Sequence, residues 1–147
     1  MYKRQREGCA STHFRRLAAP TSQRPLPAES ASWRSQDVWR SIRETPVLDT
    51  PHALCDARTV EASGLVTSEI RYPKRDGELC RVRHSPDQRW SYISEMRKAE
   101  VLLFKQYDSD RGQQARFTPH AAFDHPASPP DAPPRTSIEV RCLVTFQ

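Results

Sequence analysis

One histidine and three residues downstream of it form the group with the clearest chemical potential in this sequence. His120 lies between two phenylalanines in the stretch FTPHAAF, residues 117–123, and Arg135, Ser137 and Arg141 follow it. A neutral imidazole binds transition metals, and an arginine guanidinium pairs with a carboxylate through two parallel hydrogen bonds. A histidine on one strand with arginines on the next would therefore suit a pocket for a metal and a carboxylate. The same residues would equally suit an ordinary half-exposed strand pair with surface salt bridges.

Other catalytic patterns are missing from the sequence. The glycines, at positions 8, 64, 77 and 112, form no phosphate-binding loop, and no G-x-S-x-G nucleophile elbow occurs. His120 and His125 stand on either side of a short segment that runs into a proline-rich loop, which is not the spacing of a helical zinc pair. The four cysteines contain no C-x-x-C pair, and the apolar surroundings of Cys55 and Cys142 predict reduced, buried thiols.

Non-haem iron chemistry is the specific possibility that remains. Such sites hold Fe(II) with two histidines and one carboxylate and leave positions open for a 2-oxo acid and O₂. An arginine then binds the distal carboxylate of 2-oxoglutarate. His120 is thus a candidate metal ligand, and the Arg-x-Ser step of Arg135 and Ser137 is a candidate for binding the cosubstrate. Arg141 fits that second role equally well.

Short strands are the elements that would position these residues. The run from Glu100 to Ser109 predicts a buried strand that ends in a polar turn. In the last segment Ile138, Val140, Cys142, Val144 and Phe146 share one strand face, and Arg135, Ser137, Glu139 and Arg141 share the other. An Asp-Gly pair at 76–77 predicts a hairpin between strands at 68–72 and 78–84. The pattern favours an antiparallel barrel or sandwich over an α/β fold.

The segments between residues 32 and 65 are harder to assign. Residues 32–42 suggest either a strand or a helical turn, and prolines at 46 and 51 predict an irregular segment over 46–56. His52 lies in that segment, where a surface or packing role is expected. Residues 56–65 suggest a short helix that begins at the cap Asp56.

Composition divides the chain into an arm and a domain. The 147 residues allow one domain, and a hydrophobic content of 36% with 13 prolines indicates that only part of the chain packs into it. Residues 1–32 have no sustained helical or strand period and predict a disordered basic arm. The domain is expected over residues 33–147.

The charge distribution argues against a nucleic-acid-binding domain. Residues 1–40 contain eight Lys and Arg against three Asp and Glu, whereas the rest of the chain contains fifteen of each. The basicity therefore belongs to the arm, and no nucleic-acid partner is expected, although a contact between the arm and RNA or DNA is a weaker alternative. No apolar run is long enough for a membrane span, which predicts a soluble, cytoplasmic protein.

Several sequence blocks carry a family resemblance. They are Trp39-Arg40, Pro46-Val47, Ala53–Asp56, Trp90–Tyr92, Glu100–Ser109, Pro119–Phe123 and Ser137–Arg141, in this order. Together they resemble the C-terminal part of the asaB/CmcJ-type hydroxylase/desaturase family, which includes gibberellin-desaturase-like and endoperoxide-forming enzymes of fungal secondary metabolism. The resemblance covers roughly residues 33–147.

The resemblance implies a mainly β fold, a partial double-stranded β-helix (jelly roll), and an oxidoreductase that uses Fe(II) and 2-oxoglutarate on a small organic molecule. By the same resemblance His120 matches the distal metal histidine. Arg141, with Arg135 as runner-up and Ser137 beside it, matches the 2-oxoglutarate site. Lys105, Tyr107 and Asp108 match a family block that suggests a structural or pocket-lining role.

One departure from the family pattern limits what the resemblance implies. Family members carry a His-x-Asp ligand pair upstream of the Trp-Arg block, and no His-x-Asp occurs in this chain. We therefore expect a truncated oxygenase that lacks two of three iron ligands, and a non-catalytic fragment or binding module is the alternative. A partial barrel would leave strand edges and apolar surface exposed, which predicts self-association.

Overall fold

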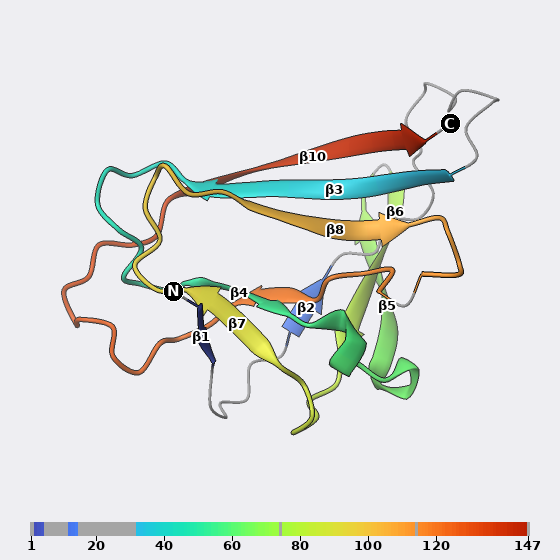
Figure 1. Ribbon diagram of the computed structural model, residues 1–147, viewed down its shortest axis with the longest axis horizontal. Coiled ribbons are helices and arrows are strands. Elements are labelled where there is room, and N and C mark those ends of the chain that lie inside the picture. The colour runs from blue at the N-terminus through green and yellow to red at the C-terminus, as the bar shows by residue number, and fades with distance from the viewer. Residues whose placement is uncertain (1, 5–11, 15–31, 74, 114, 147) are drawn as a thin grey trace.

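Antiparallel strands make up nearly all the regular structure of the chain. The computed structural model describes residues 2–4, 12–14, 32–73, 75–113 and 115–146 (Figure 1). The strands are β1 (Tyr2–Arg4), β2 (Thr12–Phe14), β3 (Ser32–Ser41), β4 (His52–Cys55), β5 (Leu65–Tyr72), β6 (Arg75–Val82), β7 (Trp90–Ile93), β8 (Leu102–Asp108), β9 (His120–Ala122) and β10 (Ser137–Phe146). Two 3₁₀ turns, η1 (Ala57–Thr59) and η2 (Ala62–Gly64), are the only helical elements in these ranges. The expected mainly β class is confirmed.

Three long strands, in the order β10-β3-β8, form the sheet that runs across the top of Figure 1. The alternating pattern of the last segment forms β10, and residues 32–42, assigned above to either a strand or a helical turn, form the central strand β3. Because side chains alternate along a strand, Ser35, Asp37, Trp39 and Ser41 of β3 lie on the buried face. Their neighbours in β3 are half-buried on the other face.

A second sheet, with the order β1-β7-β4-β9, lies below the first in Figure 1. Strand β4 is a correction to the irregular segment expected over residues 46–56. The prolines at 46 and 51 both precede β4, so its four residues keep their hydrogen bonds to β7 and β9. Ala53, Tyr92 and Phe123 form the core of this sheet.

The hairpin of β5 and β6 forms a third sheet with β2, in the order β2-β6-β5. The hairpin prediction is confirmed, but the turn lies earlier than the Asp-Gly pair suggested. Tyr72 is opposite Arg75, whereas Asp76 and Gly77 belong to the strand and pair with residues 71 and 70. The expected helix over 56–65 is instead η1 and η2, although Asp56 does cap η1 by accepting a hydrogen bond from the Arg58 backbone N–H at 3.1 Å.

The main hydrophobic core lies between the first two sheets. It consists of Trp39, Val47, Met96, Leu102 and Phe104, each at most 6% exposed. Burying aromatic and aliphatic side chains of this size contributes about 1.5–3 kcal/mol each to folding. The core therefore fixes the spacing between β3 and β8 on one side and β4 on the other.

Two expectations from the sequence meet a different outcome in the fold. The predicted burial of Cys142 is wrong: its thiol is free and exposed, whereas Cys55 is free and buried. Cys142 shares the apolar face of β10, and no described element covers that face.

Most of the predicted disordered arm, residues 1–32, lies outside the described residues; within it the structure places the short strands β1 and β2. The part of the chain described here has no helix of the length and apolarity that a bilayer span requires.

Candidate functional site

His120 is the first residue of β9 and projects between the two sheets. Its ring centroid lies 4.6 Å from that of Phe104 in β8. The Nδ1 atom is 2.9 Å from the Thr118 carbonyl oxygen, and because a carbonyl only accepts, Nδ1 carries the proton and Nε2 carries the lone pair. Burial lowers the pKa of His120. The result is a neutral imidazole that presents an unprotonated Nε2, which is how histidine ligands of metals are usually oriented.

A second imidazole, that of His52 in β4, lies next to His120. The two ring centroids are 5.4 Å apart. The His52 ring stacks on Trp39 at 4.8 Å with an interplanar angle of 10°, and the residue is 8% exposed. Its Nε2 is buried without a hydrogen-bond partner among the residues the structure describes. Burial, reinforced by the nearby His120 and Arg135, lowers the pKa of His52 to about 3, so this ring is neutral at physiological pH.

Arg135 lies in the loop before β10, close enough to His52 for its charge to affect the pKa of that ring. Its Nη1 donates a hydrogen bond of 2.7 Å to the Thr50 carbonyl, and its Cζ lies 5.5 Å from the Trp39 ring centroid. Partial burial lowers its pKa, opposed by the charge of Asp49. Within the described ranges no carboxylate forms a salt bridge with this guanidinium. Arg135 is therefore a half-buried cation with unused hydrogen-bond donors.

Arg141, in contrast, is already paired. Its Nε and Nη2 donate to the two carboxylate oxygens of Asp37, each at 2.6 Å, and Nη2 also approaches Glu139 at 3.4 Å. Asp37 is fully buried in β3, opposite Arg141 in the strand register. The hydrogen bonds that Arg141 donates to Asp37 raise the pKa of Arg141. Ser137 begins β10, opposite the buried Ser41.

The structure brings the sequence-predicted residues close to one another. His120 is near enough to Asp37 and Arg141 for both charges to affect its pKa, and His52 is similarly affected by His120 and Arg135. Strands β3, β4, β9 and β10 thus contribute to one site between the sheets. His52 is the member that sequence reasoning did not select, because nothing in the proline-flanked segment around it indicated a strand.

The site does not contain a complete set of metal ligands among the described residues. No group of three or more His, Cys, Asp or Glu side chains in that part of the chain has a geometry able to hold a metal ion. The carboxylate whose charge acts on His120 is that of Asp37, and it is occupied by Arg141. His120 can offer one nitrogen to a metal, and the remaining ligands would have to come from elsewhere.

The block around β8 has a mainly structural role. Asp108 is fully buried and accepts hydrogen bonds from Arg34 Nε at 2.9 Å, from Lys105 Nζ at 2.7 Å and from the Asp110 backbone N–H at 3.0 Å. This network ties β3 to β8 and to the turn that follows. Gln106 is also fully buried, yet neither its amide oxygen nor its amide nitrogen has a partner in the described residues.

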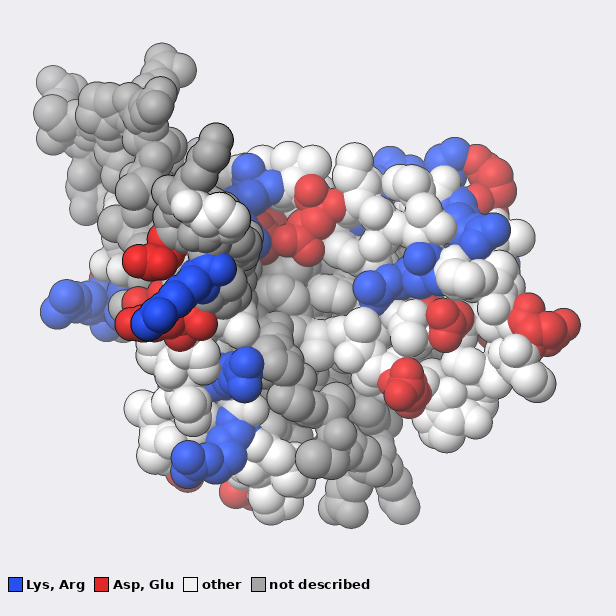
Figure 2. Space-filling view, turned by 180° about the vertical axis from the view of Figure 1, so that it is seen from behind, with Lys and Arg blue, Asp and Glu red and all other residues white. Residues whose placement is uncertain are grey.

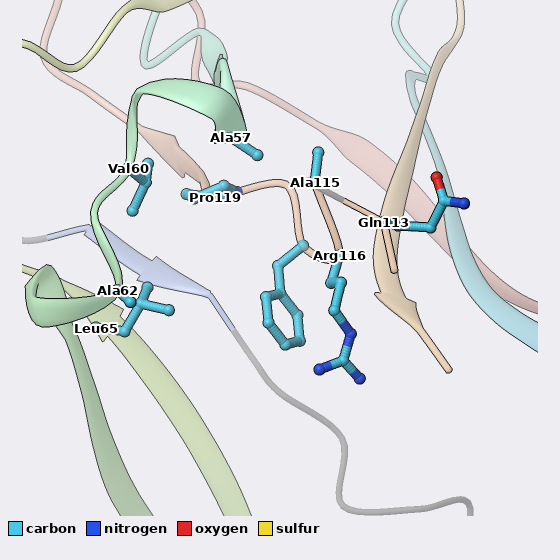
Figure 3. Close-up of a pocket in the computed structure, with 9 residues that line it drawn as sticks. Ala57, Val60, Ala62, Leu65, Gln113, Ala115, Arg116 and Pro119 are labelled. Carbon is cyan, nitrogen blue, oxygen red and sulfur yellow. The ribbon is translucent and has the colours of Figure 1, made fainter. Parts of the chain in front are cut away.

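A small pocket lies beyond Pro119 and does not include His120. It has a volume of about 170 Å³ and is lined by Ala57, Val60, Ala62, Leu65, Gln113, Ala115, Arg116, Phe117 and Pro119. Figure 3 shows Val60 and Leu65 on one side and Ala115 and Arg116 on the other. Arg116 already donates to the Asp108 carbonyl and the Tyr107 hydroxyl. Gln113 donates to the Asp110 carboxylate, and the rest of the lining is apolar or small.

The charges on one face of the molecule are mixed rather than segregated. Figure 2 shows lysines and arginines interspersed with aspartates and glutamates on the face seen from behind. The charge concentrated at the site therefore comes from its own residues, chiefly Arg135 and the Asp37–Arg141 pair.

Comparisons with known proteins identify the relatives of this chain. The family described as "Oxidoreductase/YMDC permease-like domain" matches residues 9–145. The Fe(II)/2-oxoglutarate-dependent dioxygenase nvfI of Aspergillus novofumigatus is 45% identical over 114 residues, which are 76% of this chain and 40% of that protein. The hydroxylase/desaturase asaB of Aspergillus flavus is 36% identical over 129 residues, covering 78% of this chain and 56% of that protein.

Solved structures show the same likeness. One structure of the iron and alpha-ketoglutarate-dependent endoperoxidase NvfI superposes with a TM-score of 0.76 at 30% identity and covers 99% of this chain and 59% of that one. The W199F variant gives a TM-score of 0.71 at 38% identity, over 80% and 44% of the two chains. These matches confirm the resemblance to the hydroxylase/desaturase family and the jelly-roll class. The chain spans roughly half the length of these relatives.

Proposed function

We propose a function from the premise that this chain belongs to the Oxidoreductase/YMDC permease-like domain family. Relatives at 33–45% identity are named as Fe(II)/2-oxoglutarate-dependent dioxygenases or hydroxylase/desaturases. We infer that this chain provides the 2-oxo acid site and one metal-binding histidine of such an oxygenase. Iron, when bound by a full ligand set, would supply the oxygen chemistry.

The fit to iron is incomplete. His120 suits one coordination position, because its Nδ1–H is held by the Thr118 carbonyl and its Nε2 is unprotonated. Affinity and open-site geometry come from the whole ligand set, and the described residues do not supply one. We therefore derive no chemical step through the metal and assign to the chain only binding and positioning.

The fit to a 2-oxo acid is better, and the observation that carries the proposal is the contrast between the two arginines. Arg141 has the Nε–Nη2 edge of its guanidinium occupied by the Asp37 carboxylate, and Nη2 also donates to Glu139. Arg135 has a single hydrogen bond, to a backbone carbonyl, and is half-buried beside Trp39. A half-buried cation that forms no salt bridge favours an anionic ligand, and a guanidinium binds a carboxylate through paired hydrogen bonds. Arg135, with Ser137 two residues away, is thus our preferred carboxylate-binding residue, and Arg141 supports the site through Asp37.

Replacing Arg135 by glutamine tests this assignment. We expect the dissociation constant of 2-oxoglutarate, measured by calorimetry on the full chain, to rise at least about tenfold, because a charge-assisted pair contributes about 1.5–3 kcal/mol. Arg97→Gln removes the same charge from an exposed position outside the site and should leave binding unchanged. Equal binding by the Arg135→Gln variant and the wild-type chain would refute the assignment.

The incomplete ligand set favours a second candidate function, a binding module without oxygenase activity of its own. Anaerobic titration with Fe(II) and 2-oxoglutarate separates the two candidates. A visible absorption band that requires both additions and is lost in His120→Ala would support the oxygenase. Binding of 2-oxoglutarate that is unaffected by Fe(II) and by His120→Ala would support the binding module.

Substrate, partners and location are proposals of the same standing. By analogy with the named relatives, the substrate is a small organic molecule. The free thiols of Cys55 and Cys142 fit a reducing compartment such as the cytoplasm. Self-association is proposed from the exposed apolar residues of β10 and β8, which are described below.

A further inference from the structure

The His52 side chain links the two halves of the proposed site. Strand register places it there: Leu54 is opposite His120, and His52 is opposite Ala122, so the two histidines are diagonal neighbours on one face of the β4–β9 pair. Thr50 lies two residues before His52 in the sequence, and its carbonyl accepts the hydrogen bond from Arg135. The His52 ring is therefore adjacent both to the metal-binding histidine and to the carboxylate-binding arginine.

Trp39 holds this arrangement in place. His52 stacks on the indole at 4.8 Å and Arg135 lies 5.5 Å from the same ring centroid. Phe104 contacts both imidazoles, with ring centroids 5.7 Å from His52 and 4.6 Å from His120. The orientation of His52 is thus fixed by aromatic packing on both sides before any ligand arrives, which is the preorganisation that a binding group requires.

One ring nitrogen of His52 is unused among the described residues. The residue is more than nine-tenths buried, and its Nε2 has no partner in the described chain. A buried polar atom without a partner costs stability, whereas an apolar residue of similar size would pack against Trp39 without that cost. A histidine at this position is therefore better explained by a ligand than by packing.

We propose that His52 is a second contact for the 2-oxo acid, donating an imidazole N–H to the carboxylate that Arg135 binds. This inference rests on the proposed function and extends it by adding a residue for cosubstrate recognition. The charge balance favours an anion at this position: the guanidinium of Arg135 has no salt-bridge partner among the described residues, the two imidazoles are neutral, and Asp37 is paired with Arg141. A metal cation beside His52 would instead face the charge of Arg135.

The geometry also defines the class of ligand. A 2-oxo acid that contacts a metal at His120 and reaches Arg135 and His52 needs a second, distal carboxylate. The site should therefore distinguish 2-oxoglutarate from a monocarboxylic analogue such as 2-oxobutyrate, which cannot engage the two basic residues. Removing the His52 side chain should weaken the binding of the dicarboxylic acid and leave the binding of the monocarboxylic acid unchanged.

The test compares His52→Leu with His52→Gln in the full chain. Leucine keeps the apolar contacts with Trp39 without a donor, and glutamine restores a donor. We expect the calorimetric dissociation constant of 2-oxoglutarate to rise about tenfold in His52→Leu and to recover in part in His52→Gln, with 2-oxobutyrate unchanged. His84→Leu, at an exposed position after β6, is the matched control and should bind as the wild-type chain does. Circular dichroism checks that each variant is folded.

The outcomes separate this inference from the function on which it rests. If Arg135→Gln weakens 2-oxoglutarate binding and His52→Leu does not, or if His52→Leu binds more tightly, His52 is a packing residue and the inference is wrong. If neither substitution changes binding, the proposed cosubstrate site itself is wrong. A joint loss with recovery by glutamine supports both.

Discussion

The two faces of the β10–β3–β8 sheet differ in an unusual way. The inner face, toward the second sheet, carries fully buried polar residues, among them Asp37, Gln106 and Asp108. The outer face carries apolar residues that are largely exposed, with Leu103 at 62% and Val140 at 51%. A sheet in a simple sandwich buries its apolar face and exposes its polar one. Part of the polar surface of this sheet is inside, and part of its apolar surface is outside.

This reversal agrees with the proposed ligand site on the inner face and with the proposed interface on the outer face. Buried polar groups cost stability unless they are paired. On the inner face Asp37 is paired with Arg141 near His120, and Asp108 is paired with Arg34 and Lys105. On the outer face the strand register aligns Val140, Val38 and Leu103 in one row across the sheet. Exposed apolar surface that crosses several strands usually marks an interface.

Breaking the buried ion pair should produce the largest effect on the inner face. Arg141→Met leaves Asp37, which has no exposed surface, without both of its charge-assisted hydrogen bonds. An uncompensated buried charge of this kind costs about 3–5 kcal/mol in the free energy of unfolding. Urea denaturation monitored by circular dichroism measures the change.

The double variant Asp37→Asn, Arg141→Met is the control for this experiment. It removes both charges and should recover much of the lost stability. A single Arg141→Met variant that is as stable as the wild-type chain would show that Asp37 reaches water, contrary to its full burial.

Acid should destabilise the folded chain through His52, which stacks on Trp39 of the inner face. Its pKa is about 3 in the folded chain and about 6.5 in an unfolded one, so below pH 6.5 only the unfolded state takes up the proton. The stability associated with the neutral ring is complete above pH 6.5 and is lost as the pH falls. Between pH 7 and pH 5 this amounts to about 2 kcal/mol.

His52→Leu removes this contribution and is the comparison. The free energy of unfolding should decrease between pH 7 and pH 5 in both proteins. This decrease should be about 2 kcal/mol smaller in the variant than in the wild-type chain. Burial also lowers the pKa of His120, so this residue adds equally to the acid sensitivity of both proteins. An identical pH dependence in the two proteins would mean that His52 is accessible to protons in the folded state.

The contrast between the faces also shows what the sequence could and could not predict. Period-two alternation identified β8 and β10 and grouped Arg135, Ser137 and Arg141 apart from Ile138 and Val140. Alternation states which residues share a face, but it does not state which face is inside, and Cys142 was placed on the wrong side for that reason. The inside of a sheet depends on what packs against it, which is a tertiary property.

The details of the site depended on contacts between distant parts of the chain. Arg141 is engaged because Asp37, 104 residues earlier, lies opposite it in β3. His52 belongs to the site because Trp39 stacks on it and β4 pairs with β9. Neither contact leaves a local signal in the sequence. The pattern alone therefore made the two arginines equivalent candidates and predicted a surface or packing role for His52.

A smaller gain is expected from Gln106. Its buried amide has no partner in the described chain, and Gln106→Met replaces it with an apolar side chain of similar length. We expect the free energy of unfolding to rise by about 1 kcal/mol, because an unsatisfied buried group is removed. Gln88→Met is the control, since the Gln88 amide donates to the Arg83 carbonyl and accepts from Trp90. Lower stability in Gln106→Met would reveal an unrecognised partner for the amide.

The smallest effect on stability is expected on the outer face, where the effect on association should be larger. Val140→Lys places a charge in the centre of the apolar row of β10, at a position that is already half-exposed, so the free energy of unfolding should change by less than about 0.5 kcal/mol. If the row is an interface between chains, sedimentation velocity should show less self-association in this variant than in the wild-type chain. Thr145→Lys adds the same charge to β10 on the opposite face and should associate as the wild-type chain does. A loss of several kcal/mol in Val140→Lys would contradict the comparison itself, because it would mean that the outer face is buried within the folded chain.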